Sequence, residues 1–119
     1  MSPTAAQRRG TYFEKKTADA LRSEGYAVIE ARASKGVADL WAAKIGQLLM
    51  VQVKAGEATL RDDWVNGLYT EAALHGALAV IADYPKPGRL RLRRIIGPHD
   101  FRSQRWPCVP FITDEVGGR

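Results

Sequence analysis

The sequence is poor in the residues that build disulfides and zinc sites. Among its 119 residues it has one cysteine, Cys108, and two histidines, His75 and His99. One cysteine cannot form a disulfide within the chain, and no spacing of these three residues matches a zinc site. We therefore interpret Cys108 as a tail residue, and His75 as a residue that interacts with the last carbonyls of a helix.

The sequence also lacks a long apolar segment. No hydrophobic run is long enough to cross a membrane, and the amino terminus does not have the pattern of a signal peptide. With 119 residues, the chain is expected to form one domain, residues 1–119, whose ends at 1–10 and 112–119 are flexible. These features predict a cytoplasmic protein, of a cell or of a virus-infected host.

Hydrophobic periodicity predicts an α/β protein. The expected order is a helix at residues 11–24, strands at 26–31, 37–43 and 48–54, a helix at 60–75, and strands at 77–82 and 89–93. The first three strands are expected to form a meander. Residues 77–82 are almost wholly apolar, which is typical of a central strand covered on both faces. Residues 106–110 show no clear pattern and receive no assignment.

Three polar residues interrupt two consecutive apolar segments. Asp39 lies in the segment 36–42, and Gln52 and Lys54 lie at the end of the segment 48–54. Side chains alternate along a strand, so Gln52 and Lys54 share one face about 7 Å apart. Asp and Lys also commonly close strands, so Asp39 taken alone is better explained as a strand-end residue that reaches solvent.

A further carboxylate, Glu14, lies in the first expected helix. It stands at the margin of the apolar stripe that includes Phe13, Thr17 and Leu21. Thr11 and Glu14 also have the spacing of a capping box, in which Glu14 would only bind the Thr11 amide. Both roles for Glu14, helix cap and ligand, stay open at this point.

The positive charge is concentrated in one part of the chain. Residues 1–84 carry ten basic and ten acidic side chains, whereas residues 85–106 carry seven basic and one acidic. Alternation in residues 89–93 predicts a strand with an apolar face on the core and an outward row of arginines, Arg89, Arg91 and Arg93. Such a row suits phosphates, because arginine can donate two hydrogen bonds to one phosphate. The same charges would also protect an edge strand from aggregation.

A helix carboxylate, a strand aspartate and a polar-x-Lys sequence follow one another along the chain. This order resembles the PD-(D/E)XK, or restriction-endonuclease-like, nuclease superfamily, and within it the archaeal-type Holliday junction resolvases. The matching segments are residues 9–14, 34–40 and 51–54, and the likeness covers roughly residues 8–95. Two positions depart from the usual pattern. Ala38 replaces a proline, and Gln52 replaces an acidic residue, which removes one negative charge from the site.

The resemblance implies a restriction-endonuclease-like core, in which a central mixed β-sheet of about five strands is flanked by helices. It implies a DNA endonuclease of recombination or repair that hydrolyses phosphodiester bonds with Mg²⁺, for which Mn²⁺ can substitute. The implied substrate is a four-way junction, cut by a homodimer. Two alternatives are kept: another structure- or end-specific DNA nuclease of this superfamily, and an inactive nucleic-acid-binding module.

The resemblance also implies roles for individual residues. The metal would be held by Asp39 as the central ligand, with Glu14, the Gln52 amide oxygen and the Val53 carbonyl. Lys54 would orient the attacking water or offset charge at phosphorus, and Ser34 would lie beside the scissile phosphate. The residues expected to contact DNA are Arg8, Arg9, Lys35, Arg89, Arg91 and Arg93.

Overall fold

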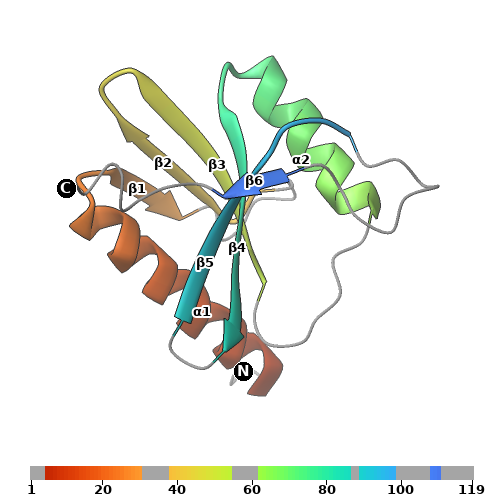
Figure 1. The fold of residues 1–119 in the computed structure, drawn as a ribbon. Coiled ribbons are helices and arrows are strands. Elements are labelled where there is room, and N and C mark those ends of the chain that lie inside the picture. Colours follow the sequence, from red (N-terminus) through yellow and green to blue (C-terminus); the bar gives the residue numbers. More distant parts are fainter. Residues whose placement is uncertain (1–4, 31–37, 55–61, 87–88, 99–107, 111–119) are drawn as a thin grey trace.

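The computed structural model describes residues 5–30, 38–54, 62–86, 89–98 and 108–110. Its elements are α1 (Ala5–Ser23), β1 (Ala27–Glu30), β2 (Leu40–Lys44), β3 (Gln47–Lys54), α2 (Asp62–Leu74), β4 (Leu78–Lys86), β5 (Arg89–Ile95) and β6 (Cys108–Pro110). The predicted α/β class is confirmed: a mixed sheet is flanked by helices (Figure 1). None of the helices in these ranges is long and apolar enough to span a membrane.

The six strands lie side by side in the order in which they occur in the sequence. All neighbouring pairs are antiparallel except β3 and β4, which are parallel. Parallel neighbours need a long crossover connection, and α2 lies in the connection between these two strands. The predicted meander of the first three strands is therefore present, and the parallel pair lies at the centre of the sheet.

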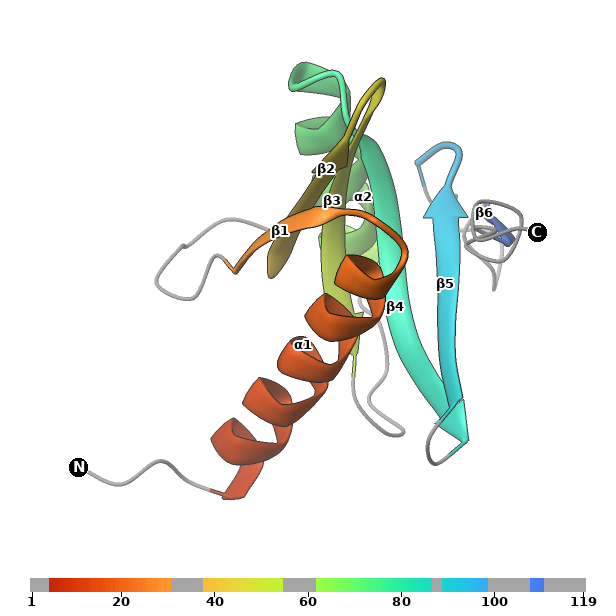
Figure 2. The same cartoon turned by 90° about the vertical axis from the view of Figure 1, so that its left-hand side faces the viewer.

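Each face of the sheet is covered by one helix. α1 buries Leu21 against one face, in a cluster with Leu40 and Val51. α2 buries Leu68 against the other face, in a cluster with Ile81. Figure 2 shows the two helices on opposite sides of the strands. Because side chains alternate along each strand, residues two apart face the same helix.

β4 is enclosed on both faces. Val80 and Ala82 pack in the α1 cluster, whereas Ala79 and Ile81 pack in the α2 cluster. All four are buried. The sequence-based prediction of a central strand covered on both faces is confirmed, although β4 continues to Lys86 rather than ending at residue 82.

The start of α1 differs from the prediction. The helix begins at Ala5, six residues before the expected start at Thr11. Residues 5–9 are alanine, glutamine and arginine, which favour helix strongly enough to offset the cost of Gly10. Thr11 therefore lies inside the helix and cannot cap it. The capping-box interpretation of Glu14 is wrong for this reason.

The carboxyl-terminal side of the sheet also differs. The unassigned segment contains a short strand, β6, which pairs with β5. β6 covers β5 only from Arg93 to Ile95, so the interpretation as a charge-protected edge is wrong for that end of the strand. Among the described residues, no strand pairs with the outer side of residues 89–92. With β6 the sheet has six strands, where about five were predicted. Of the ends expected to be flexible, 1–10 and 112–119, residues 5–10 belong to α1, and residues 1–4 and 112–119 lie outside the described residues.

His75 behaves as predicted, as a residue at the end of a helix. It follows α2 directly, and its ring atom Nδ1 lies 2.8 Å from the Glu71 carbonyl. Gly76 comes next with a φ of 67°. A glycine adopts this left-handed conformation without strain, so it ends the helix and starts the approach to β4.

A buried hydrogen bond fastens α1 to β4. The hydroxyl of Thr17, a fully buried side chain, donates to the Phe13 carbonyl at 2.7 Å and lies 2.8 Å from the Tyr84 hydroxyl. Thr17 has one hydroxyl proton, so Tyr84 must be the donor in the second bond. Burial is the main reason why the pKa of Tyr84 is raised.

We expect Tyr84→Phe to lower the free energy of unfolding by about 1 kcal/mol, the usual net value of one hydrogen bond. The ring packing is kept, and only the donor to Thr17 is lost. Urea unfolding measures the change. Tyr12→Phe is the matched control, because Tyr12 is 58% exposed, and it should not alter stability. Equal losses in the two variants would show that the Tyr84 hydroxyl does not contribute through Thr17.

Candidate active site

Asp39 lies directly before β2 and binds this end of the strand to β3. Its backbone N–H donates to the Val51 carbonyl at 2.8 Å, and its Oδ2 accepts a hydrogen bond from the Val53 N–H at 2.8 Å. The last residue pair of the two strands is Leu40 with Val51. Beyond that pair, the carboxylate replaces a backbone carbonyl as the acceptor. β2 thus begins at Leu40 instead of residue 37, and the carboxylate is fixed beside Gln52.

The charge on Asp39 is only partly compensated. Burial raises the pKa of Asp39, and this effect is larger than the lowering caused by the Val53 N–H and by the positive charge of Lys54. A half-buried carboxylate whose charge is disfavoured in this way attracts an additional cation. The structure thus provides a negatively charged oxygen that would gain from a metal ion.

Gln52 contributes an oxygen atom that lacks a hydrogen-bond donor. Within the described part of the chain, its Oε1 is buried and has no partner. Leaving a buried acceptor unsatisfied costs about 1–3 kcal/mol. A cation that used this oxygen as a ligand would remove the cost. The predicted metal ligands Asp39 and Gln52 are therefore adjacent and chemically suited to one ion.

Lys54 closes β3 on the same face as Gln52. Its ammonium lies 4.3 Å from the centre of the Trp64 ring in α2, a cation–π contact. The Trp64 side chain is half-buried. The apolar periodicity that predicts a helix at residues 60–75 does not show that this ring lies beside a lysine.

The arginine strand has an acidic partner that the sequence analysis missed. Arg91 donates from Nε and Nη2 to the two oxygens of Asp83, at 2.9 and 2.7 Å, and Arg93 donates to Asp83 Oδ2 at 2.8 Å. Arg89 and Arg91 are exposed as predicted, while Arg93 is partly covered. Asp83 lies opposite Arg91 because β4 and β5 pair in that register. The predicted strand ended one residue too early to include Asp83.

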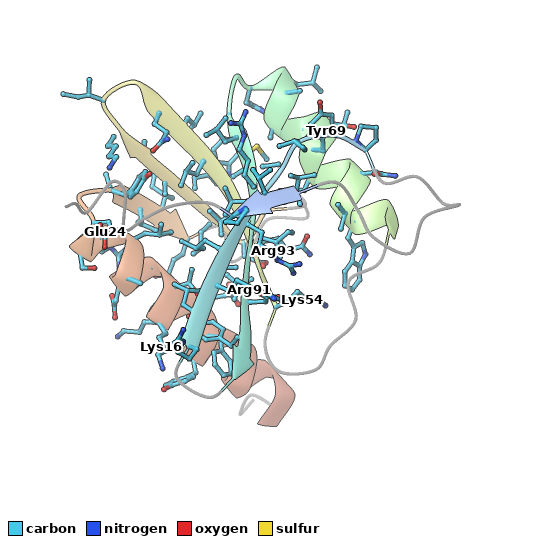
Figure 3. All side chains as sticks on the ribbon, viewed as in Figure 1. Lys16, Glu24, Lys54, Tyr69, Arg91 and Arg93 are labelled. Atoms are coloured by element: carbon cyan, nitrogen blue, oxygen red, sulfur yellow. The ribbon has the colours of Figure 1, made fainter. Side chains whose placement is uncertain are left out.

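These residues share one face of the sheet. Lys54 pairs with Asp83, and Asp83 pairs with Arg91, across three neighbouring strands. One step along the same face, Gln52 pairs with Ile81, which lies in the α2 cluster. Figure 3 shows Lys54, Arg91 and Arg93 in one region of the molecule.

The remaining predicted residues lie on α1 or outside the described ranges. Glu14 is half-buried on α1, which packs on the opposite face of the sheet. Over the described ranges, no three histidine, cysteine, aspartate or glutamate side chains form a group able to hold a metal. Ser34 and Lys35 lie outside the described residues. Arg8 and Arg9 belong to α1, but their side chains are outside the described part as well.

Comparisons with known proteins identify the family and the fold. The sequence matches the family described as archaeal Holliday junction resolvase (Hjc) over residues 5–94. A search of the curated proteins found no match. Among the solved structures, Hjc of Archaeoglobus fulgidus, described as a Holliday junction resolvase from an archaeal hyperthermophile, aligns with a TM-score of 0.65 and 24% identity. The alignment covers 90% of this chain and 88% of that chain, so the two share a fold.

The raised pKa of Asp39 predicts how stability depends on pH without a metal. The folded state holds the Asp39 proton more tightly than the unfolded chain, so stability falls as the pH rises from the unfolded pKa through the folded pKa. Asp39→Asn removes this penalty and keeps an oxygen that can accept from Val53. In EDTA we expect the variant to be more stable than the wild type at pH 7, and to lose this advantage at about pH 3, below the ordinary Asp pKa.

Urea unfolding of both proteins at the two pH values measures the difference. A variant that is less stable than the wild type at pH 7 would show that the ionised Asp39 stabilises the fold, which would contradict the dominant role of burial.

Proposed function

The chain belongs to the archaeal Holliday junction resolvase family, and from this membership we propose that it is a Mg²⁺-dependent DNA endonuclease that cuts four-way junctions as a homodimer. One observation supports the proposal most strongly. A desolvated carboxylate, Asp39, lies beside a buried amide oxygen without a donor, that of Gln52. Both groups are suited to a hard divalent cation.

Asp39 and the Gln52 oxygen would hold the cation, and Glu14 and the Val53 carbonyl are the proposed additional ligands. When bound, the divalent cation would lower the pKa of water and stabilise negative charge on the attacking and leaving oxygens. Mg²⁺ needs few protein ligands because it keeps several waters, so the loss of one carboxylate at Gln52 is compatible with binding. Mn²⁺ accepts the same oxygen ligands.

Lys54 would act on the phosphate itself. Its ammonium lies on the same sheet face as Gln52 and near enough to Asp39 to lower the pKa of that carboxyl. An ammonium at this place can donate hydrogen bonds to a phosphate oxygen or to the attacking water. Ser34 is proposed to contribute a further donor beside the scissile phosphate.

The positive charge would bind the DNA backbone. The formal net charge is +5, and Arg89 and Arg91 are exposed on the same sheet face as Lys54. Arg8, Arg9, Lys35 and Arg93 are the other proposed contacts. Binding that depends on neutralised phosphates weakens steeply with salt, because counterions are released.

A homodimer would supply the second active site. Each chain has a single candidate site, whereas resolving a junction requires paired cuts in two strands. Two sites related by a twofold axis meet this requirement with one kind of interface. Sedimentation at micromolar concentration tests the oligomeric state, and a monomer would overturn this part of the proposal.

The cleavage test uses a synthetic four-way junction and a linear duplex of matched sequence. We expect the wild type to cut the junction preferentially, in Mg²⁺ or Mn²⁺ and not in EDTA. Asp39→Asn and Lys54→Ala should lower the cutting rate by about a hundredfold or more, as expected for groups that stabilise transition-state charge, while junction binding stays close to that of the wild type. Full activity in EDTA or in Asp39→Asn would contradict the proposal, and equal cutting of both DNAs would indicate a simple duplex nuclease.

Gln52→Glu tests whether this side chain binds the metal. The change restores a negative charge to the site, so the Mg²⁺ concentration for half-maximal rate should fall by about threefold to tenfold. Thr70→Glu is the matched control, since Thr70 is exposed in the second half of α2 and the change adds the same charge. Identical metal dependence in Gln52→Glu and the control would place Gln52 outside the coordination shell.

A further inference from the structure

Asp83 lies between a lysine and an arginine on the sheet face that α2 covers. It pairs in register with Lys54 of β3 on one side and with Arg91 of β5 on the other. Residues in register on neighbouring strands lie close enough for their side chains to interact. Asp83 can therefore form an ion pair with the lysine or with the arginines. The position of the lysine ammonium depends on which ion pair forms.

Both carboxylate oxygens of Asp83 accept hydrogen bonds from arginines. Arg91 binds both carboxylate oxygens, through Nε at 2.9 Å and Nη2 at 2.7 Å, and Arg93 adds a third bond at 2.8 Å. The Asp83 side chain is only 14% exposed, so water competes weakly for it. The planar guanidinium of Arg91 matches the two oxygens in a way that a lysine ammonium cannot.

Lys54 is left with a different partner. Its ammonium lies over the Trp64 ring, 4.3 Å from the ring centre. Among the described residues it forms no salt bridge with any carboxylate. An aromatic face holds an ammonium without taking away its charge. Those of the three N–H donors that do not face the ring can still reach a phosphate oxygen.

We propose that Arg91 and Arg93 are positioning residues for Lys54. By occupying Asp83, they prevent this carboxylate from forming an ion pair with Lys54, and they keep the ammonium at Trp64 and available to the DNA phosphate. The inference rests on the proposed function, because it assumes that Lys54 takes part in strand cutting. It assigns the arginine row a second task besides contact with phosphates.

The test compares Arg91→Gln with Arg91→Gln/Asp83→Asn. In the single variant Asp83 Oδ1 loses its donor while Arg93 keeps its bond to Oδ2, so Oδ1 can bind Lys54. The kcat for junction cutting should then fall about tenfold, within the range of coupling between neighbouring charged groups. In the double variant residue 83 has no charge that could capture Lys54, so kcat should recover to within about threefold of the wild type. Arg94→Gln is the matched control: it removes the same charge from the other face of β5, and it should leave kcat unchanged.

Trp64 provides a readout that does not require cutting. Capture of Lys54 by Asp83 moves the ammonium away from the ring, so the Trp64 contribution to fluorescence should change in Arg91→Gln and return in the double variant. The contribution is obtained by subtracting the spectrum of the same protein with Trp64→Phe. If Arg91→Gln does not fold, as judged by circular dichroism, Arg93→Gln with and without Asp83→Asn takes its place.

Three results would overturn the inference. A double variant as slow as Arg91→Gln would mean that Arg91 acts directly on the DNA. An Arg91→Gln protein with the kcat of the wild type would mean that the position of the Lys54 ammonium does not depend on Arg91. Trp64 fluorescence that stays constant would mean that Lys54 is not displaced. A wild type that cuts no DNA, together with the expected fluorescence changes, would refute the proposed function and leave the charge arrangement supported.

Discussion

The bond between the Asp39 carboxylate and the Val53 N–H is the constraint on which the rest of the site depends. It lies where the pairing of β2 with β3 ends, and it fixes the half-buried carboxylate against the backbone next to Gln52. One hydrogen bond and the nearby Lys54 charge lower the pKa of Asp39 less than burial raises it. The folded protein therefore holds a carboxylate in surroundings that favour an added cation, and it holds an unsatisfied amide oxygen beside it.

Several features could be predicted from the sequence because they depend on local periodicity. Alternation along residues 48–54 places Gln52 and Lys54 on one face wherever that strand lies, and the apolar run at 77–82 indicates a strand enclosed on both sides. The order of polar residues was sufficient for the resemblance to resolvases, and the family match and the shared fold confirm it. The roles of Asp39, Gln52 and Lys54 in chemistry stay predictions.

Other features depend on where elements end and on what packs against them. The early start of α1 follows from a helix-favouring segment that outweighs Gly10, so the cap expected at Thr11 does not form. Asp83 was missed because β4 extends past the apolar run. The contact of Trp64 with Lys54 was missed because apolar periodicity in a helix does not show which cation lies near it. Together Asp83 and Trp64 position the cations on the sheet face that α2 covers. Asp83 binds Arg91 and Arg93, and the Trp64 ring holds Lys54. The positions of these charges thus depend on contacts between strands and on the contact of β3 with α2.

If Asp39 and Gln52 bind the same divalent cation, diffraction from crystals of the wild type grown with Mn²⁺ will show it. We expect an anomalous peak within about 2.5 Å of both an Asp39 carboxylate oxygen and Gln52 Oε1, as expected for oxygen ligands of a divalent cation. A fully occupied Mn²⁺ peak that lies elsewhere, or one with Gln52 Oε1 outside its coordination shell, would show that the two side chains do not share an ion.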